Sequence, residues 1–436
     1  MASLIKSPFQ IISYIRSNRF LRNVFLVASG SAGAQGLTIA LSPLVTRIYG
    51  PEVFGVLGTF VAILMFLVPL ATMTYPLAIV LPRSDYEAAG LLRLSVYLSF
   101  GTTTLITGFF WAKSDWFVET LGIQEVEPYT FILPLSLLFF VWVDIAQQWL
   151  IRKNKFSLIA RVALVHSFLL NVAKVMLGVW YPFTLVLIGL TTAGYIVHAF
   201  LLGFGAYHVF SKCLSCRHIS LISVAKKYAA FPLYRAPQVF INAASQSMPI
   251  ILLTALFELE SAGWYTLGRM VMGMPSMLLG KSVSDVLYPD LAEASRKGKN
   301  LRKLIVKTTF GLVLAGIIPF SIVVFFGPAL FAEVFGEEWR MAGEYARWLA
   351  FFFFFNFINK PSVSAVAVLG VERGLFVYEI ISTATKAISI FVGYYWFNSD
   401  LIAVSLFALT GAFAYIVLIC WVILVAEKLN NYAKAG

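Results

Sequence analysis

The sequence predicts an all-α integral membrane protein, with twelve transmembrane helices arranged as two parallel-repeat six-helix bundles around a central cavity. Of its 436 residues, 60% are hydrophobic and 12% are charged, whereas charged residues make up about a quarter of an ordinary soluble domain. The 39 Phe, 19 Tyr and 10 Trp exclude disorder. Apolar runs far longer than a strand argue against a soluble β protein. The 3 cysteines imply no disulfide framework.

Twelve apolar stretches have the length of about 20 residues that crosses a bilayer as a helix. The first six are predicted at residues 24–48, 55–81, 90–110, 128–150, 156–179 and 182–205. The last six are predicted at residues 237–257, 264–288, 304–326, 342–369, 375–396 and 401–426. The fifth and sixth are separated only by Trp180-Tyr181-Pro182, which we interpret as a tight external turn.

Charges in the connecting segments predict the orientation, because Lys and Arg are retained on the cytoplasmic side of a membrane. Most of these residues fall in the two terminal segments and in every second loop. The opposite side holds only Arg47, Lys113 and Arg340, beside most of the acidic residues. Both termini are therefore predicted to be cytoplasmic. Topology explains most of the net charge of +12, so no nucleic-acid partner is expected.

The chain divides at a basic central loop. Residues 1–23 mix cations with apolar side chains, which is typical of an amphipathic helix on the inner membrane surface. The predicted order is this segment, a six-helix bundle at 24–205, a cytoplasmic linker at 206–236, a second bundle at 237–426 and a cytoplasmic tail at 427–436.

The two halves share a sequence repeat. Glu52 and Gly55 match Glu260 and Gly263 at a shift of 208 residues. An even number of spans in each half gives both repeats the same orientation, with a symmetry axis along the membrane normal. In such proteins a cleft between the halves opens alternately to either side. This organisation favours a secondary transporter.

Charged residues inside the predicted spans are the first candidates for a binding site. Each costs about 2.5 to 3.5 kcal/mol on insertion scales, so exposure to lipid is disfavoured. We interpret five of them as the cationic wall of a water-filled cavity, and Arg47 as a further candidate near its external mouth. The alternative is internal ion pairing, such as Glu379 with Lys386. The five cations are Lys174, Arg269, Arg347, Lys360 and Lys386.

The first and seventh spans are unusually polar and are interrupted by Gly or Pro. Paired spans of this kind are a sequence pointer to a transport site. We therefore add Gln35, Asn242 and Gln246 to the candidate substrate-binding residues. The alternative for the first span is close packing of helices through its small residues, such as Gly30 and Gly33.

Three acidic residues are candidates for coupling transport to a proton or sodium gradient: Asp144, Asp285 and Glu379. Structural pairing is an equally open interpretation for each. The sequence contains no phosphate-binding loop of the Gly-x-x-x-x-Gly-Lys-Ser/Thr type, so ATP coupling is not predicted. Cys213, Cys216 and His218 fall short of a four-ligand zinc site, and neither a metal nor another cofactor is expected.

The stretch Leu44-Val-Thr-Arg-Ile-Tyr-Gly-Pro-Glu-Val-Phe-Gly55, with the polar span before it and the twelve-span layout, resembles bacterial polysaccharide and O-antigen flippases. These are the Wzx-type members of the MOP exporter superfamily. The resemblance implies a multi-pass protein of the bacterial cytoplasmic (inner) membrane that moves undecaprenyl-pyrophosphate-linked oligosaccharide to the outer leaflet. It also implies a V-shaped pair of bundles with a cationic cavity, membrane lipids as neighbours and polysaccharide assembly proteins as partners.

Two other functions stay open at this point. A multidrug exporter of the same superfamily would suit cationic drugs, but cations outnumber acids inside the spans. A membrane glycosyltransferase or polymerase needs room for an external active site, and the longest external segment is only residues 111–127. The flippase, a transporter rather than an enzyme, fits the residues best.

Overall fold

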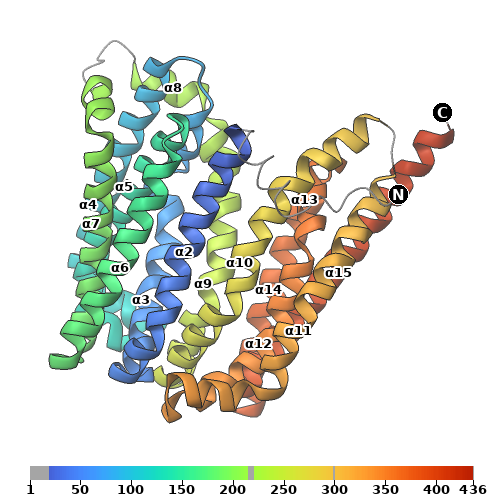
Figure 1. Cartoon of the computed structure of the whole chain (residues 1–436). Helices are drawn as coiled ribbons and strands as arrows, with labels where there is room; N and C mark the ends of the chain where they lie inside the picture. The colour runs from blue at the N-terminus through green and yellow to red at the C-terminus, as the bar shows by residue number, and fades with distance from the viewer. Residues whose placement is uncertain (1–18, 215–219, 298–299, 436) are drawn as a thin grey trace. The chain divides into compact units, whose positions relative to one another are not determined.

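The computed structural model describes residues 19–214, 220–297 and 300–435. Within these ranges every regular element is a helix and no strand occurs (Figure 1). Long apolar sequences satisfy all their backbone hydrogen bonds internally only as helices, which is the condition for crossing a membrane. The predicted all-α fold is confirmed.

Among the described residues, twelve long helices follow the twelve predicted spans in order (Figure 1). The first six are α2 (Arg19–Ile48), α3 (Pro51–Thr72), α4 (Asp85–Leu121), α5 (Leu133–Arg152), α6 (Phe156–Trp180) and α7 (Thr184–Leu214). The last six are α9 (Ala236–Leu256), α10 (Leu259–Arg296), α11 (Leu301–Phe335), α12 (Arg340–Ile358) continued by α13 (Lys360–Leu369), α14 (Glu372–Phe397) and α15 (Asp400–Ala435).

Short helices join several of these. They are η1 (Tyr75–Val80), η2 (Gln124–Ile132), α8 (Leu221–Lys227), η3 (Phe231–Arg235) and η4 (Glu337–Trp339). Over the described residues, ten helical stretches are long and apolar enough to cross a membrane. The other two long helices, α2 and α10, have 30 and 38 residues and carry polar side chains such as Gln35 and Arg269.

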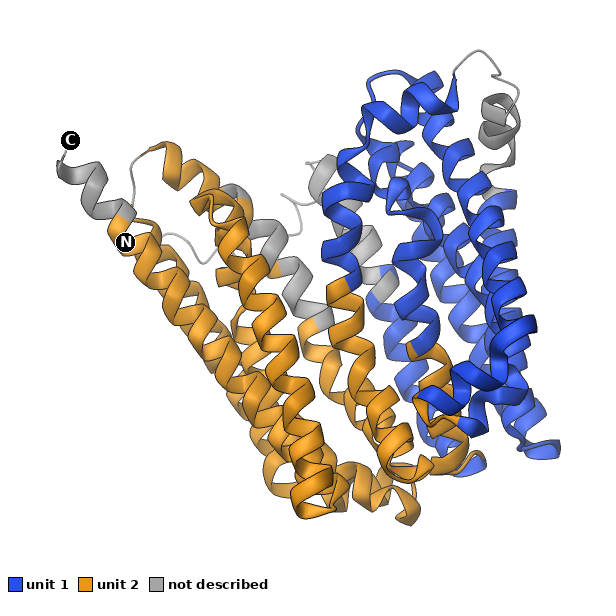
Figure 2. Cartoon of the chain, turned by 180° about the vertical axis from the view of Figure 1, so that it is seen from behind, with its two compact units in different colours: residues 1–48, 63–120, 124–240 blue, residues 49–62, 121–123, 241–436 orange. Residues whose placement is uncertain are grey.

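The chain forms two compact units (Figure 2). Unit 1 comprises residues 1–48, 63–120 and 124–240, and unit 2 comprises residues 49–62, 121–123 and 241–436. Unit 2 therefore includes the beginning of α3 as well as most of the last six long helices. The boundaries between the units fall within α3, at the end of α4 and within α9.

In unit 1, small and hydroxyl residues bring α2 against α6. A Cβ atom on Gly30 would lie 2.3 Å from the Cβ of Ala160, so only glycine permits this approach. Further along, the hydroxyls of Thr38 and Ser167 are 3.0 Å apart, and Asn171 Nδ2 donates to Thr38 Oγ1 at 3.2 Å. Part of the polar character of α2 thus serves helix packing, the alternative that the sequence left open.

Ion pairs join the helix ends of unit 1. Arg152 at the end of α5 lies 3.0 Å from the carboxylate of Asp85 at the start of α4, and it also donates to the Pro82 carbonyl at 2.6 Å. Lys227 of α8 pairs with Glu87. The hydrogen bond to Glu87 raises the pKa of Lys227 above its ordinary value.

In unit 2, the starts of α3 and α10 cross through two glycines. A Cβ on Gly55 would lie 2.1 Å from the carbonyl oxygen of Leu259, and a Cβ on Gly263 would lie 1.9 Å from the carbonyl oxygen of Pro51. Leu259 follows Pro51 by 208 residues, as Gly263 follows Gly55. The two contacts are therefore equivalent under the sequence repeat, and the repeat is expressed as a reciprocal backbone contact.

Asp400, at the start of α15, joins three helices of unit 2. Its Oδ2 accepts hydrogen bonds from Tyr345 Oη of α12 and from Ser261 Oγ of α10, both at 2.5 Å. Its Oδ1 accepts from the Leu401 backbone at 2.6 Å. A carboxylate at a helix N-terminus is also favoured by the helix dipole.

We expect Tyr345→Phe to destabilise unit 2, because it removes a hydrogen bond to a charged group. Such a bond contributes about 1.5 to 3 kcal/mol, so the midpoint of thermal unfolding in detergent should fall. Tyr395→Phe is the matched control, because Tyr395 on α14 is 73% exposed. Equal midpoints for the two variants would contradict the assigned role of Tyr345.

Candidate functional site

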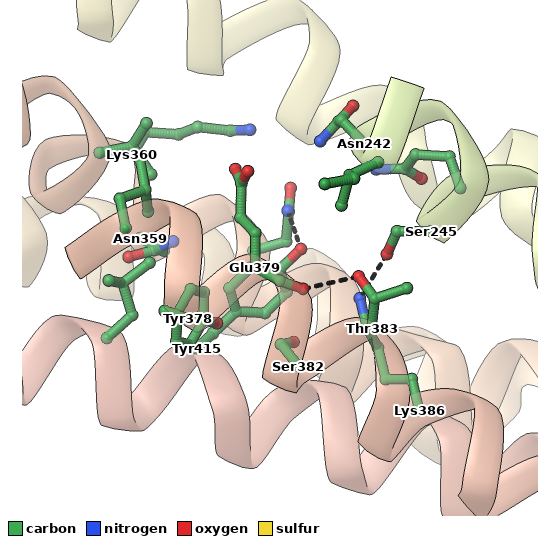
Figure 3. A pocket seen from close by; sticks show the side chains of 16 residues that line it. Asn242, Ser245, Asn359, Lys360, Tyr378, Glu379, Ser382, Thr383, Lys386 and Tyr415 are labelled. Atoms are coloured by element: carbon green, nitrogen blue, oxygen red, sulfur yellow. Dashed lines mark hydrogen bonds between the residues drawn. The ribbon is translucent and has the colours of Figure 1, made fainter. Parts of the chain in front are cut away.

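A polar pocket of about 320 Å³ lies within unit 2 (Figure 3). Side chains from α9, α12, α13, α14 and α15 line it, together with Asn359 between α12 and α13. Long helices of a single unit thus bring together residues that are more than 170 positions apart in the sequence. The pocket brings together five of the twelve predicted site residues.

Five of the predicted site residues line this pocket. Asn242 and Gln246 come from α9, Lys360 is the first residue of α13, and Glu379 and Lys386 lie on α14. The two cations and one acid give the lining a surplus of positive charge. Uncharged polar groups surround them, so the pocket suits a polar anion better than a cation.

Lys386 is held in the wall of the pocket. Only 7% of the residue is exposed, and its Nζ donates to Ser245 Oγ of α9 at 2.8 Å (Figure 3). Glu379, two turns earlier on α14, interacts electrostatically with Lys386. The contact with Ser245 fixes the position of the ammonium group, while the proximity of Glu379 keeps the ion-pair interpretation open beside the cavity interpretation.

Lys360 lies where α12 ends and α13 begins. Asn359 precedes it and is 2% exposed, and Pro361 follows, so its backbone stands at the start of a new helix. This junction carries the half-buried side chain of Lys360 to the pocket from a different helix than Lys386.

Aromatic and amide groups complete the lining. Asn356 Nδ2 donates to Tyr415 Oη at 2.7 Å, which ties α12 to α15, and Tyr378 joins from α14. Amides and hydroxyls bind sugar hydroxyls, and tyrosine rings offer apolar faces for a sugar ring. The arrangement can therefore bind an anion and a carbohydrate side by side.

Arg269 and Arg347 are placed differently from the lysines. Arg269 of α10 donates from Nη1 to the backbone carbonyl of Gln246 at 2.6 Å and from Nη2 to its side-chain oxygen at 3.3 Å. It thus positions a residue that lines the pocket. Arg347 of α12 pairs with Glu344 at 3.0 Å and donates from Nε to the Val324 carbonyl at 2.9 Å, and it does not line the pocket.

The remaining predicted residues do not line this pocket. In unit 1, Gln35 of α2, Lys174 of α6 and Asp144 of α5 are half-buried, and Arg47 is exposed in the last turn of α2. The side chain of Asp285, on α10, lies outside the described side chains, as do those of Cys213, Cys216 and His218. The roles assigned to these residues stay predictions.

Several pocket residues were not selected from the sequence. Ser382 shares a helical face with Glu379 and Lys386, and that spacing could have identified it. Tyr378 and Tyr415 carry no such signal, because a tyrosine in an apolar span is ordinarily a packing residue. Among the described residues, no three His, Cys, Asp or Glu side chains are grouped so that they could hold a metal ion.

Solved structures of other proteins share this fold. The lipid II flippase MurJ in an inward closed conformation aligns with a TM-score of 0.69 at 13% identity, over 92% of this chain and 87% of that chain. A MOP superfamily transporter from Pyrococcus furiosus aligns with a TM-score of 0.66 at 13% identity, over 96% and 98%. A MATE protein in complex with MaD3S aligns with a TM-score of 0.62 at 14% identity, over 97% and 98%.

The fold is therefore that of the MOP superfamily transporters, as the sequence predicted. Residues 20–295 match the polysaccharide biosynthesis protein family. The chain belongs to that family. No curated protein matches the sequence significantly. With this fold and ten described helical stretches that are long and apolar enough to cross a membrane, the chain is a multi-pass membrane protein.

Proposed function

We propose that the protein is a secondary transporter that flips undecaprenyl-pyrophosphate-linked oligosaccharide units from the cytoplasmic to the outer leaflet of a bacterial cytoplasmic membrane. The observation that carries the proposal is the presence of Lys360 and Lys386 in one polar pocket with a single carboxylate, Glu379. Ammonium groups bind phosphate as point charges. In a site shielded from bulk water this attraction is stronger than at a surface.

The dimensions of the pocket limit which part of the cargo it receives. Small-molecule pockets span about 300 to 1,000 Å³, and this one, at about 320 Å³, suits the pyrophosphate with the adjoining sugar. In this proposal the polyprenyl tail stays in lipid, where its transfer into a polar site would be unfavourable. Alternating access then carries the polar head across.

We also propose what drives outward transfer of the cargo. An inside-negative membrane potential favours outward movement of an anion by about 2.3 kcal/mol per charge for each 100 mV. A proton or sodium gradient acting through Asp144, Asp285 or Glu379 would add to it. Polysaccharide assembly proteins would supply and remove the lipid-linked cargo.

The proposal is tested with the purified full chain in liposomes. Fluorescent polyprenyl-pyrophosphate oligosaccharide is offered, and its transfer is measured as the fraction that a membrane-impermeant oxidant of sugar diols reaches. The same oligosaccharide on uncharged polyprenol is the control cargo. We expect transfer of the pyrophosphate form and little transfer of the uncharged form. Efflux of a cationic dye without transfer of either lipid would contradict the proposal and favour a multidrug exporter.

A further inference from the structure

Two histidines stack inside unit 1. His166 lies on α6 and His198 on α7, both at mid-helix in the part of the chain that crosses the membrane. Their ring centroids are 4.4 Å apart and the ring planes differ by 24°. Ionisable residues inside a membrane are costly, so each is a candidate functional residue. The candidate coupling residues chosen from the sequence did not include this pair.

The surroundings leave one nitrogen of each ring unsatisfied. Nε2 of His166 and Nε2 of His198 are both buried and have no hydrogen-bond partner among the described residues. The backbone of Gly194 on α7 interacts with the imidazole of His166. A Cβ on Gly194 would lie 3.2 Å from Nε2 of His166, so glycine permits the imidazole to approach α7 this closely.

The titratable neighbours make a second positive charge unfavourable. Lys174, two turns further along α6, interacts electrostatically with His166. Two imidazolium rings stacked beside this cation in a low-dielectric interior would repel one another strongly. The pair therefore accommodates one proton at most. The other titratable side chains described on α2, α5, η2 and α7, which pack against this region, are Arg47, Asp144, Arg152, Glu125, Glu127, Tyr129 and Tyr195.

We propose that His166 and His198 form a proton-binding site that couples a proton gradient to movement of the cargo. A proton from water on one side of the membrane adds to the lone pair of one Nε2. The same proton leaves that nitrogen when the protein is open to the other side of the membrane, so no other bond forms or breaks. The proton-free pair fits the present packing of α6 on α7. The protonated pair needs an acceptor for Nε2–H and distance from Lys174, and it favours a different packing of these helices.

The two packings of α6 on α7 would bind the proton with different affinities. Proton binding would therefore shift the equilibrium between them, as any ligand shifts an equilibrium between two conformations. The coupling to cargo movement rests on the proposed function, whereas proton binding by the histidine pair does not. Two measurements separate these claims. One follows transport, and the other follows the histidines without cargo.

The first measurement uses the full chain in liposomes with the lipid-linked oligosaccharide, with and without an imposed pH gradient. We expect the gradient to accelerate transfer by the unmodified protein. His166→Asn and His198→Asn, prepared with the wild-type unfolding midpoint, should abolish that acceleration. His208→Asn, which changes a histidine outside the pair, should keep the full acceleration. Acceleration retained in both pair variants overturns the proposal.

The second measurement uses histidine-labelled protein in lipid and nuclear magnetic resonance without cargo. The signals of His166 and His198 are identified by their loss in the two variants. We expect the pair to take up one proton on acidification. We also expect His166 to be protonated more easily in His198→Asn, because that variant has no second imidazole that could carry a positive charge beside it. Absence of any protonation of the pair down to about pH 5 overturns the proton site. A lack of cargo transfer by the unmodified protein would overturn only the proposed function.

Discussion

Gly263→Ala is expected to prevent the normal packing of α10 on α3 and to lower sharply the yield of folded protein and its midpoint of thermal unfolding. The added methyl group would lie 1.9 Å from the Pro51 carbonyl oxygen, where ordinary contacts begin at 3.4 Å. The atom that it meets is backbone, so no change of side-chain rotamer relieves the overlap. The two helices would have to move apart.

The balance of energies supports a large loss. Alanine is favoured over glycine by about 1 kcal/mol in a helix interior, while overpacking costs about 1 to 3 kcal/mol and occasionally more. Separation of the helices would also disturb neighbouring contacts, including the hydrogen bond of 2.5 Å between the hydroxyls of Thr59 and Thr254. Gly55→Ala should behave in the same way, because its Cβ would lie 2.1 Å from the Leu259 carbonyl oxygen.

The matched control is Gly311→Ala. Gly311 is an exposed helical glycine of α11, and nothing in the described structure lies within 4 Å of its Cβ position. This change should leave the midpoint unchanged or raise it, since only helix propensity is altered. Thermal unfolding of all three variants in the same detergent checks the expectation. Wild-type midpoints for both Gly55→Ala and Gly263→Ala would show that the helices separate at no cost.

The fold was accessible from the sequence because its signals are local and long. An apolar run of about 20 residues specifies a membrane helix without reference to any other segment, and each of the twelve predicted spans has its helix. The repeat was visible in Glu52, Gly55, Glu260 and Gly263. The sequence did not show that each of these glycines contacts the other repeat, because a sequence shift says nothing about which surfaces meet.

The site was only partly accessible, since it depends on contacts between helices. Glu379 and Lys386 share a face of α14, and helical periodicity groups them. The hydrogen bond from Lys386 to Ser245 spans 141 positions, which no local pattern encodes. Conversely, Glu344 and Arg347 are three residues apart, a spacing typical of an ion pair on one helix, and the structure places them in such a pair.

Removal of both pocket charges, in a Lys360→Gln and Lys386→Gln double variant, is expected to abolish measurable transfer of the pyrophosphate-linked oligosaccharide. A hydrogen bond to a charged group contributes about 1.5 to 3 kcal/mol, and each 1.4 kcal/mol is about tenfold in affinity. Loss of two such contacts should therefore weaken binding by about a hundredfold or more. Glutamine keeps a polar, hydrogen-bonding side chain that is one bond shorter, so the main change is the loss of charge.

Arg373→Gln is the matched control, because Arg373 is an exposed cation at the start of α14 and does not line the pocket. It should transfer cargo at the wild-type rate. Lys360→Arg should also retain transfer, since guanidinium keeps the positive charge and Lys360 is only half-buried. Binding of the pyrophosphate-linked lipid is measured beside transfer, on variants with wild-type unfolding midpoints. If the double variant binds and transfers this cargo as the unmodified protein does, attraction by these lysines has no part in recognition, and the sugar contacts alone must select the substrate.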